Sequence, residues 1–199
     1  SYMYFSKNNP YKFFEEDFDT TFNEWDRIEI HRMLERRKDK GLPNLNQWIK
    51  NSGSSALKCF LVDEISYFGQ YEAAPYLLEI VSQSDDIELR RHCVDALGKM
   101  RYAEAENLLI DSYHLQPLII QQSIVRALKN IRSGNALSFL EDAYYNSHDV
   151  ETQLLIIRAI YLYVTPGREL FEKLKANTFQ FSGLLFEHVA NPLIKHIES

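Results

Sequence analysis

The chain has 199 residues, of which 45% are hydrophobic, and it contains only seven glycines and six prolines. This composition supplies enough apolar residues for a buried core and argues against both a β-sandwich and a disordered chain. The formal net charge of -6 at pH 7 opposes binding to nucleic acid and to anionic membranes, so we expect no nucleic-acid partner.

Residues 1–20 form an aromatic and acidic segment, which we expect either to cap the first helices or to be a mobile arm. Thr20 or Thr21 is the predicted N-cap of the first clear helix. The apolar positions of that helix would be Phe22, Trp25, Ile28 and Met33. A short second helix follows Gly41 and carries Leu42, Leu45, Trp48 and Ile49. Together the two helices predict a divergent first repeat over residues 21–53.

A four-residue motif then recurs about every 32 residues, the spacing of a helical hairpin repeat. It reads Val62-Asp63-Glu64-Ile65, Val94-Asp95-Ala96-Leu97, Val125-Arg126-Ala127-Leu128 and Ile157-Arg158-Ala159-Ile160. The second helix of each hairpin keeps the same register, with apolar sets Ala74/Leu77/Leu78, Ala105/Leu108/Leu109 and Ala136/Phe139/Leu140. Because the motif carries acids in early repeats and arginines in later ones, it also predicts acid–arginine pairs between neighbouring repeats.

The best-formed hairpin contains Leu89-Arg90-Arg91 and, one to two turns later, Ala96-Leu97-Gly98. These features resemble the HEAT-repeat family, in particular the short bacterial repeats also seen in phycobilin lyase-like proteins. The resemblance implies an all-α fold, an α-solenoid (superhelix) of about five HEAT-like helical hairpins in a single array over residues 21–199. After the first repeat, the others would span about 54–84, 85–116, 117–148 and 149–179, with a C-terminal cap at 180–199.

Several breaks and buried positions follow from this register. Gly69 would separate the helices of the second repeat, and Ser133-Gly134 those of the fourth. Thr165-Pro166-Gly167 predicts a sharper break, followed by helices over 168–176 and 181–197, the latter ended or kinked near Asn191 by Pro192. The two cysteines, Cys59 and Cys93, lie on apolar sides of first helices, so we expect reduced core thiols in a reducing, cytoplasmic environment.

The search for catalytic motifs indicates that the chain is not an enzyme. It has no Gly-rich phosphate loop, no CxxC, no HExxH and no Ser-centred elbow. No histidine is directly followed by glutamate, and His188 and His196, which are two helical turns apart, are expected to be surface or capping residues. We therefore predict no catalytic residue, no cofactor and no metal.

The most informative functional feature is the charge of the second helices. The stretches 71–84, 102–116 and 134–148 contain no Lys or Arg, and the resemblance implies that second helices line the concave face. Stepping by one repeat selects as candidate protein-binding residues Tyr76, Glu79, Asn107, Asp111, Glu141, Asp142 and Tyr145. Tyrosines among acids suit a basic or extended protein partner, so we predict a non-catalytic protein–protein interaction scaffold. The competing interpretation is a solvated helix face with incidental charge.

Two further functional hypotheses stay open. The aromatic run Tyr2–Lys7 resembles the interfacial end of a transmembrane helix, so the chain could be the cytoplasmic HEAT module of a membrane-tethered assembly, with its anchor upstream. Alternatively, it is a HEAT-like enzyme or enzyme subunit, of lyase or nucleic-acid repair type. A lyase needs a tetrapyrrole pocket and a repair protein needs a basic groove, and neither is visible in the sequence.

Overall fold

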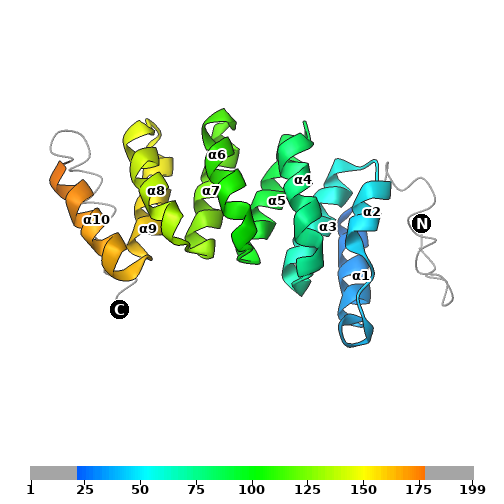
Figure 1. Cartoon of the computed structure of the whole chain (residues 1–199). Helices are drawn as coiled ribbons and strands as arrows, with labels where there is room; N and C mark the ends of the chain where they lie inside the picture. The colour runs from blue at the N-terminus through cyan, green and yellow to red at the C-terminus, as the bar shows by residue number, and fades with distance from the viewer. Residues whose placement is uncertain (1–21, 178–199) are drawn as a thin grey trace. The chain divides into compact units, whose positions relative to one another are not determined.

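The computed structural model describes residues 22–177, and within this range all regular secondary structure is helical (Figure 1). This confirms the all-α fold built from HEAT-like hairpins. Residue contacts divide the chain into two compact units, residues 1–100 and residues 101–199, which are described separately. None of the helices between residues 22 and 177 is long and apolar enough to span a bilayer.

The first helix, α1 (Glu24–Glu35), starts with a capping box. The side chain of Asn23 accepts hydrogen bonds from the backbone N–H groups of Trp25 and Asp26, at 2.9 and 3.4 Å. In return, Asp26 Oδ2 accepts from the backbone N–H of Asn23 at 2.9 Å. The N-cap is therefore Asn23, which corrects our prediction of Thr20 or Thr21; those two residues lie outside the described range.

The buried face of α1 also differs from the predicted one. Asp26, Ile30 and Leu34 are buried, whereas the predicted core residue Trp25 is 75% exposed. The capping box explains how an aspartate can be buried, because the backbone N–H of Asn23 satisfies its carboxylate. The 3₁₀ turn η3 (Lys38–Lys40) leads to α2 (Leu45–Asn51), which buries Leu45, Trp48 and Ile49 as predicted, whereas Leu42 precedes this helix.

The rest of the N-terminal unit comprises α3 (Ser55–Phe68), η4 (Tyr71–Ala73), α4 (Ala74–Gln83) and α5 (Ile87–Lys99). Helix α3 packs against both α2 and α5, and α4 packs against α5. Helix α3 ends, as predicted, at Gly69, which adopts a left-handed conformation with φ +66 that glycine tolerates best. Asp63 of α3 contacts His92 of α5, with 3.0 Å between Oδ1 and Nδ1, so its partner in the neighbouring repeat is a histidine instead of the predicted arginine.

Both cysteines of the N-terminal unit are buried and unbonded, as predicted. Burial raises the pKa of the Cys59 thiol to about 11, with the carboxylate of Asp86 adding to the effect. Burial also holds the pKa of Cys93 far above the usual value of a thiol.

The C-terminal unit contains η5 (Ala103–Ala105), α6 (Glu106–Ser112), η6 (Tyr113–Leu115), α7 (Leu118–Ile131), α8 (Gly134–Asn146), α9 (Val150–Tyr161) and α10 (Val164–Asn177). Helix α9 packs against α7, α8 and α10. The chain turns between α7 and α8 at Arg132, which has φ +57, so Gly134 belongs to α8 and the break lies just before the predicted Ser133-Gly134.

The predicted break at Thr165-Pro166-Gly167 is wrong, because α10 starts at Val164 and continues through these residues. Pro166 falls in the first turn of α10. Backbone N–H groups in a first turn have no acceptor within the helix, so the N–H that proline lacks breaks no helical hydrogen bond there. Gly167 is buried at a close approach: a Cβ at this position would overlap the carbonyl oxygen of Ile160 at the end of α9. The predicted final helix at 181–197, the kink at Pro192 and the cap at 180–199 lie outside the described residues.

Replacing Gly167 by alanine should destabilise the protein by about 1–3 kcal/mol, because the added methyl group forces α9 and α10 apart. Gly134→Ala is the matched control: Gly134 is also helical, and no other part of residues 22–177 lies within 4 Å of the point that its Cβ would occupy. This variant should be neutral or stabilising by up to about 1 kcal/mol. Urea unfolding followed by circular dichroism measures both variants. Equal midpoints for the two would contradict the close packing at Gly167.

The thiol of Cys59 should make stability fall in alkaline solution. Its folded pKa of about 11 exceeds the ordinary 9.0, so folding favours the protonated thiol. This contribution is fully present below pH 9.0 and is lost as the pH rises towards about 11. Urea midpoints at several pH values across this window should therefore decline, and the decline should be shallower in Cys59→Ala. An identical pH dependence in the two proteins would refute the assignment.

Candidate protein-binding surface

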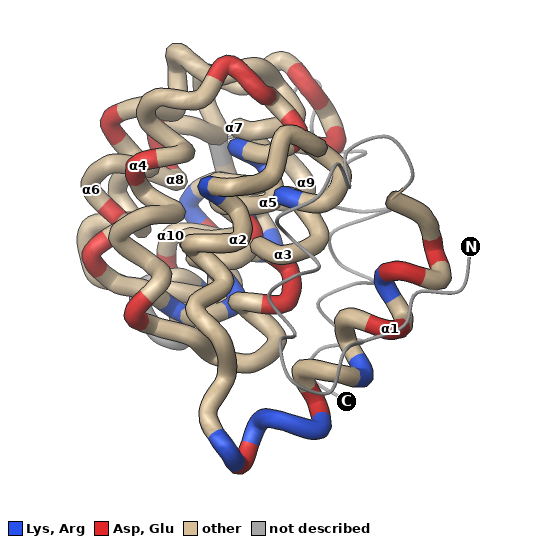
Figure 2. The backbone as a smooth tube through the Cα atoms, turned by 90° about the vertical axis from the view of Figure 1, so that its right-hand side faces the viewer, with Lys and Arg blue, Asp and Glu red and all other residues tan. Residues whose placement is uncertain are grey.

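The second helices α4, α6 and α8 carry acids and no bases along their length, whereas the first helices α5, α7 and α9 carry lysines or arginines (Figure 2). We call the exposed side chains of α4, α6 and α8 the second-helix surface. Each second helix packs through one buried side. Its opposite side makes no packing contacts, so that side can carry charged residues of a single sign. Helix α4 belongs to the N-terminal unit and α6 and α8 belong to the C-terminal unit, so the side chains of each unit are described separately.

In the N-terminal unit, Tyr76 and Glu79 of α4 line the same cavity, of about 230 Å³. Its apolar lining comes from Ile49, Ile80 and Leu89. Tyr76 is half-buried, and burial together with the charge of Glu79 raises the pKa of its phenol. The predicted tyrosine–acid pair is therefore brought together around a partly apolar hollow.

Two cations lie beside this pair, and sequence reasoning missed both. The Lys50 ammonium lies 4.5 Å from the centre of the Tyr76 ring, close enough for a cation–π interaction. Lys58 of α3 lines the same cavity. They come from α2 and from a first helix, so the absence of Lys and Arg within α4 does not make its surroundings purely acidic.

In the C-terminal unit, Asn107 and Asp111 are exposed on α6, which packs against α8. On α8, Asp142 is exposed and Tyr145 is 48% exposed. Among the residues that the structure describes, neither Asp111 nor Asp142 forms an ion pair. These carboxylates therefore keep their charge uncompensated by the described part of the protein.

Glu141 differs from the other predicted acids. It is half-buried and pairs with Lys173 of α10, with 2.5 Å between Oε1 and Nζ. Hydrogen bonding to Glu141 raises the pKa of the Lys173 ammonium. A partner would have to compete with Lys173 for this carboxylate, so Glu141 contributes less free charge than its position in the repeat predicts.

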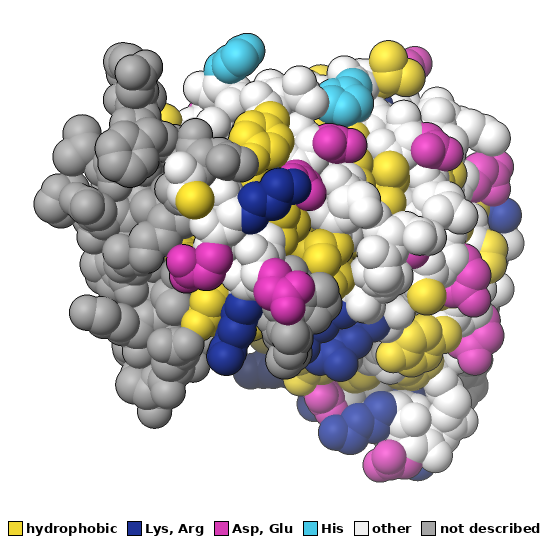
Figure 3. Space-filling view, turned by 60° about the vertical axis from the view of Figure 1, so that its left-hand side comes forward, with side chains coloured by type: hydrophobic (Ala, Val, Ile, Leu, Met, Phe, Trp, Pro, Cys, Tyr) yellow, Lys and Arg dark blue, Asp and Glu magenta, His cyan; other side chains and the backbone are white. Residues whose placement is uncertain are grey.

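The tyrosines of the second helices divide between core and surface. Tyr113 and Tyr144 are buried, at 3% and 2% exposure, whereas Tyr71 is exposed. The space-filling view from the side of α10 shows acidic side chains spread among polar and hydrophobic ones, several of them beside Lys or Arg (Figure 3). Such spacing suits several separate contacts along a partner better than one binding site for a compact cation.

The described residues offer little to metal chemistry. Between residues 22 and 177, no three or more His, Cys, Asp or Glu side chains gather in a group that could hold a metal ion. His188 and His196, whose spacing was noted in the sequence, lie outside the described range.

Comparison with known families identifies the fold. The family model for HEAT repeats matches residues 42–121 and 74–161, two overlapping spans that together cover more than half of the chain. Searches of curated proteins and of solved structures found no significant match. HEAT repeats commonly mediate protein–protein interactions, and the fold is typically non-enzymatic. With its hairpin repeats and this match, the chain belongs to the HEAT-repeat family.

Proposed function

We propose that this protein is a non-catalytic scaffold whose second-helix surface binds a basic or extended segment of a protein partner. The observation that carries the proposal is the pair of exposed carboxylates Asp111 and Asp142, on helices that pack together and contain no Lys or Arg. Complementary charge of this kind accelerates encounter and selects partners more than it adds affinity.

Affinity would come from the aromatic residues near these acids. Tyr145 is partly exposed three residues after Asp142 and stacks edge-on against the buried Tyr144, with 5.7 Å between ring centres. A tyrosine held in this way presents an apolar face and a hydroxyl group at little cost in side-chain entropy. Tyr145 is therefore the proposed anchor of the C-terminal unit.

Tyr76 is the proposed anchor of the N-terminal unit. The apolar lining beside Glu79 suits a side chain with an aliphatic stem and a charged end. Lys50 and Lys58 repel a second cation there, so we expect the partner to place only an isolated basic residue in this cavity, with neutral or acidic neighbours.

We place this activity in the cytoplasm, which the two unbonded, buried cysteines support. The net charge of -6 argues against a nucleic-acid partner. Tyr2–Lys7, on which the membrane-tethered alternative depends, lies outside the described residues, and no described observation favours a lyase or repair function.

The decisive variant replaces Glu79, Asp111 and Asp142 by lysine. Glu141 stays unchanged, because replacing it would also break its ion pair with Lys173. A partner captured from lysate of the source organism by the wild type should be lost with this variant. With the partner identified, the Kd should rise at least about tenfold and depend on salt.

The matched control replaces three other exposed acids by lysine, namely Asp39, Asp85 and Glu151. It changes the net charge equally but leaves the second helices untouched, so it should retain the partner. Circular dichroism should show the same helicity for both variants. Full retention by the first variant, or equal loss in the control, would contradict the proposed function.

A further inference from the structure

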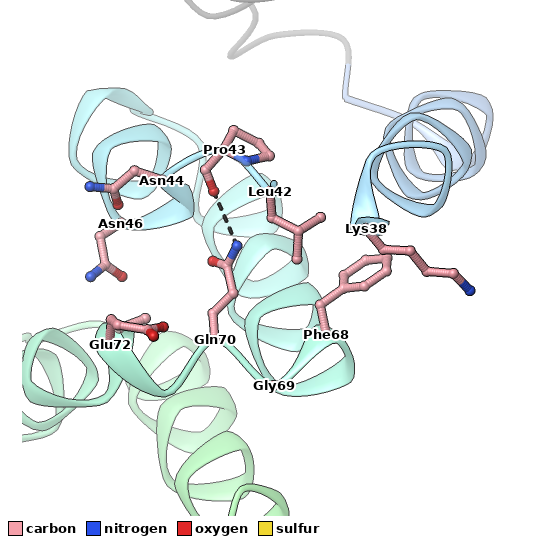
Figure 4. Close-up of a pocket in the computed structure, with 10 residues that line it drawn as sticks. Lys38, Leu42, Pro43, Asn44, Asn46, Phe68, Gly69, Gln70 and Glu72 are labelled. Carbon is pink, nitrogen blue, oxygen red and sulfur yellow. Dashed lines mark hydrogen bonds between the residues drawn. The ribbon is translucent and has the colours of Figure 1, made fainter. Parts of the chain in front are cut away.

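A second and larger cavity, of about 420 Å³, lies in the N-terminal unit (Figure 4). Its walls come from the segment after α1, the start of α2, the end of α3 and the turn η4. Leu42, Pro43 and Phe68 provide apolar surface, and polar side chains line the remainder. It shares no lining residue with the cavity at Tyr76 and Glu79, so it is a separate site.

Three of its polar side chains are already engaged by the protein. Gln70 Nε2 donates to the carbonyl oxygen of Pro43 at 3.1 Å, which ties the end of α3 to the start of α2. Asn44 caps α2 by accepting from the backbone N–H of Gln47 at 3.4 Å. Lys38 Nζ lies 2.9 Å from Glu35 Oε2, and Figure 4 shows its ammonium directed away from the other polar groups.

Two hydrogen-bond acceptors in the same cavity are not engaged. Asn46 Oδ1 is buried and has no hydrogen-bond partner among residues 22–177, a costly state for a carbonyl oxygen removed from water. Glu72 is exposed and forms no ion pair with any described residue. Figure 4 shows Asn46 and Glu72 on the same side of the cavity, contributed by α2 and η4 respectively.

A ligand that satisfies both acceptors must donate several hydrogen bonds and carry positive charge. It must also offer an apolar stem to Leu42 and Pro43. An arginine side chain meets these requirements, because its planar guanidinium has five N–H donors and can serve two separate oxygens at once. A lysine ammonium concentrates its charge at one point and fits two separated acceptors less well.

We propose that this cavity binds an arginine side chain of a polypeptide, with the guanidinium donating to Asn46 Oδ1 and to the Glu72 carboxylate. This inference goes beyond the proposed function, because neither residue belongs to the candidate residues of the second-helix surface. Its test uses small probes, so it succeeds or fails independently of any partner of that surface.

The test is an NMR titration of the full ¹⁵N-labelled chain with N-acetyl-arginine N-methylamide. Saturable shifts should be confined to the cavity, including the side-chain amides of Asn46 and Gln70. The citrulline analogue, which keeps N–H donors but lacks the charge, should bind at least about tenfold more weakly. Equal binding of the two probes would overturn the proposal, and so would binding of free arginine without binding of the blocked derivative.

Three variants sharpen the result. Glu72→Gln should weaken the arginine probe about tenfold, whereas Asn46→Asp should tighten it, because the new carboxylate keeps the acceptor and adds negative charge. Glu104→Gln is the matched control, since Glu104 occupies the corresponding position of the next 3₁₀ turn, η5, and should leave binding unchanged. Opposite effects at Glu72 and Asn46 cannot arise from misfolding alone. Wild-type affinity in both variants would overturn the assignment.

Discussion

The structure depends on one constraint: a first helix has more apolar surface than its own hairpin partner can cover. Helix α3 buries Leu57, Leu61, Val62 and Ile65 and needs both α2 and α5 beside it, as α9 needs α7, α8 and α10. Stacking of neighbouring repeats covers this apolar surface, and the first helices are buried between their neighbours. The second helices, such as α8 with its buried residues Ala136, Leu140 and Ala143, bury one stripe and keep the other side for solvent or for a partner.

Apolar stacking alone does not fix how one repeat is aligned on the next, and polar contacts between first helices contribute that alignment. In the N-terminal unit, His31 Nδ1 of α1 lies 2.8 Å from Glu64 Oε2 of α3. Asp63 of α3 contacts His92 of α5, so in this second contact the acid comes from the earlier helix and the histidine from the later one. Burial raises the pKa of Glu64, and the hydrogen bond to His31 opposes that rise. In the C-terminal unit, Gln122 bridges to Asp149 and Thr152 in the same manner. The residue types differ among these three contacts, so the repeat motif predicts the position of such contacts better than the identity of the partners.

The sequence predicts the centre of the array well, because neighbours on both sides impose the apolar register. Helix α3 ends at Gly69, as predicted, and the motif residues Val125 and Leu128 of α7 are buried. At the ends, local chemistry takes precedence. The Asn23–Asp26 capping box sets the start of α1, and the close approach at Gly167 lets α10 continue where Pro and Gly usually indicate a break. Neither effect leaves a periodic signal in the sequence, since each depends on one residue meeting one backbone group.

The same distinction applies to the candidate binding residues. Repeat register identifies the acids of the second helices, because it depends only on helix geometry. It does not identify their counter-ions, since Lys50 and Lys173 come from helices in the divergent first and last repeats. A carboxylate with a partner inside the protein must break that ion pair before it binds a second cation. For Asp111 and Asp142 the free-energy cost of binding a cation is only that of desolvation. Binding to the second-helix surface should accordingly be more sensitive to charge at Asp142 than at its sequence neighbour Glu141, although the two are adjacent and chemically alike.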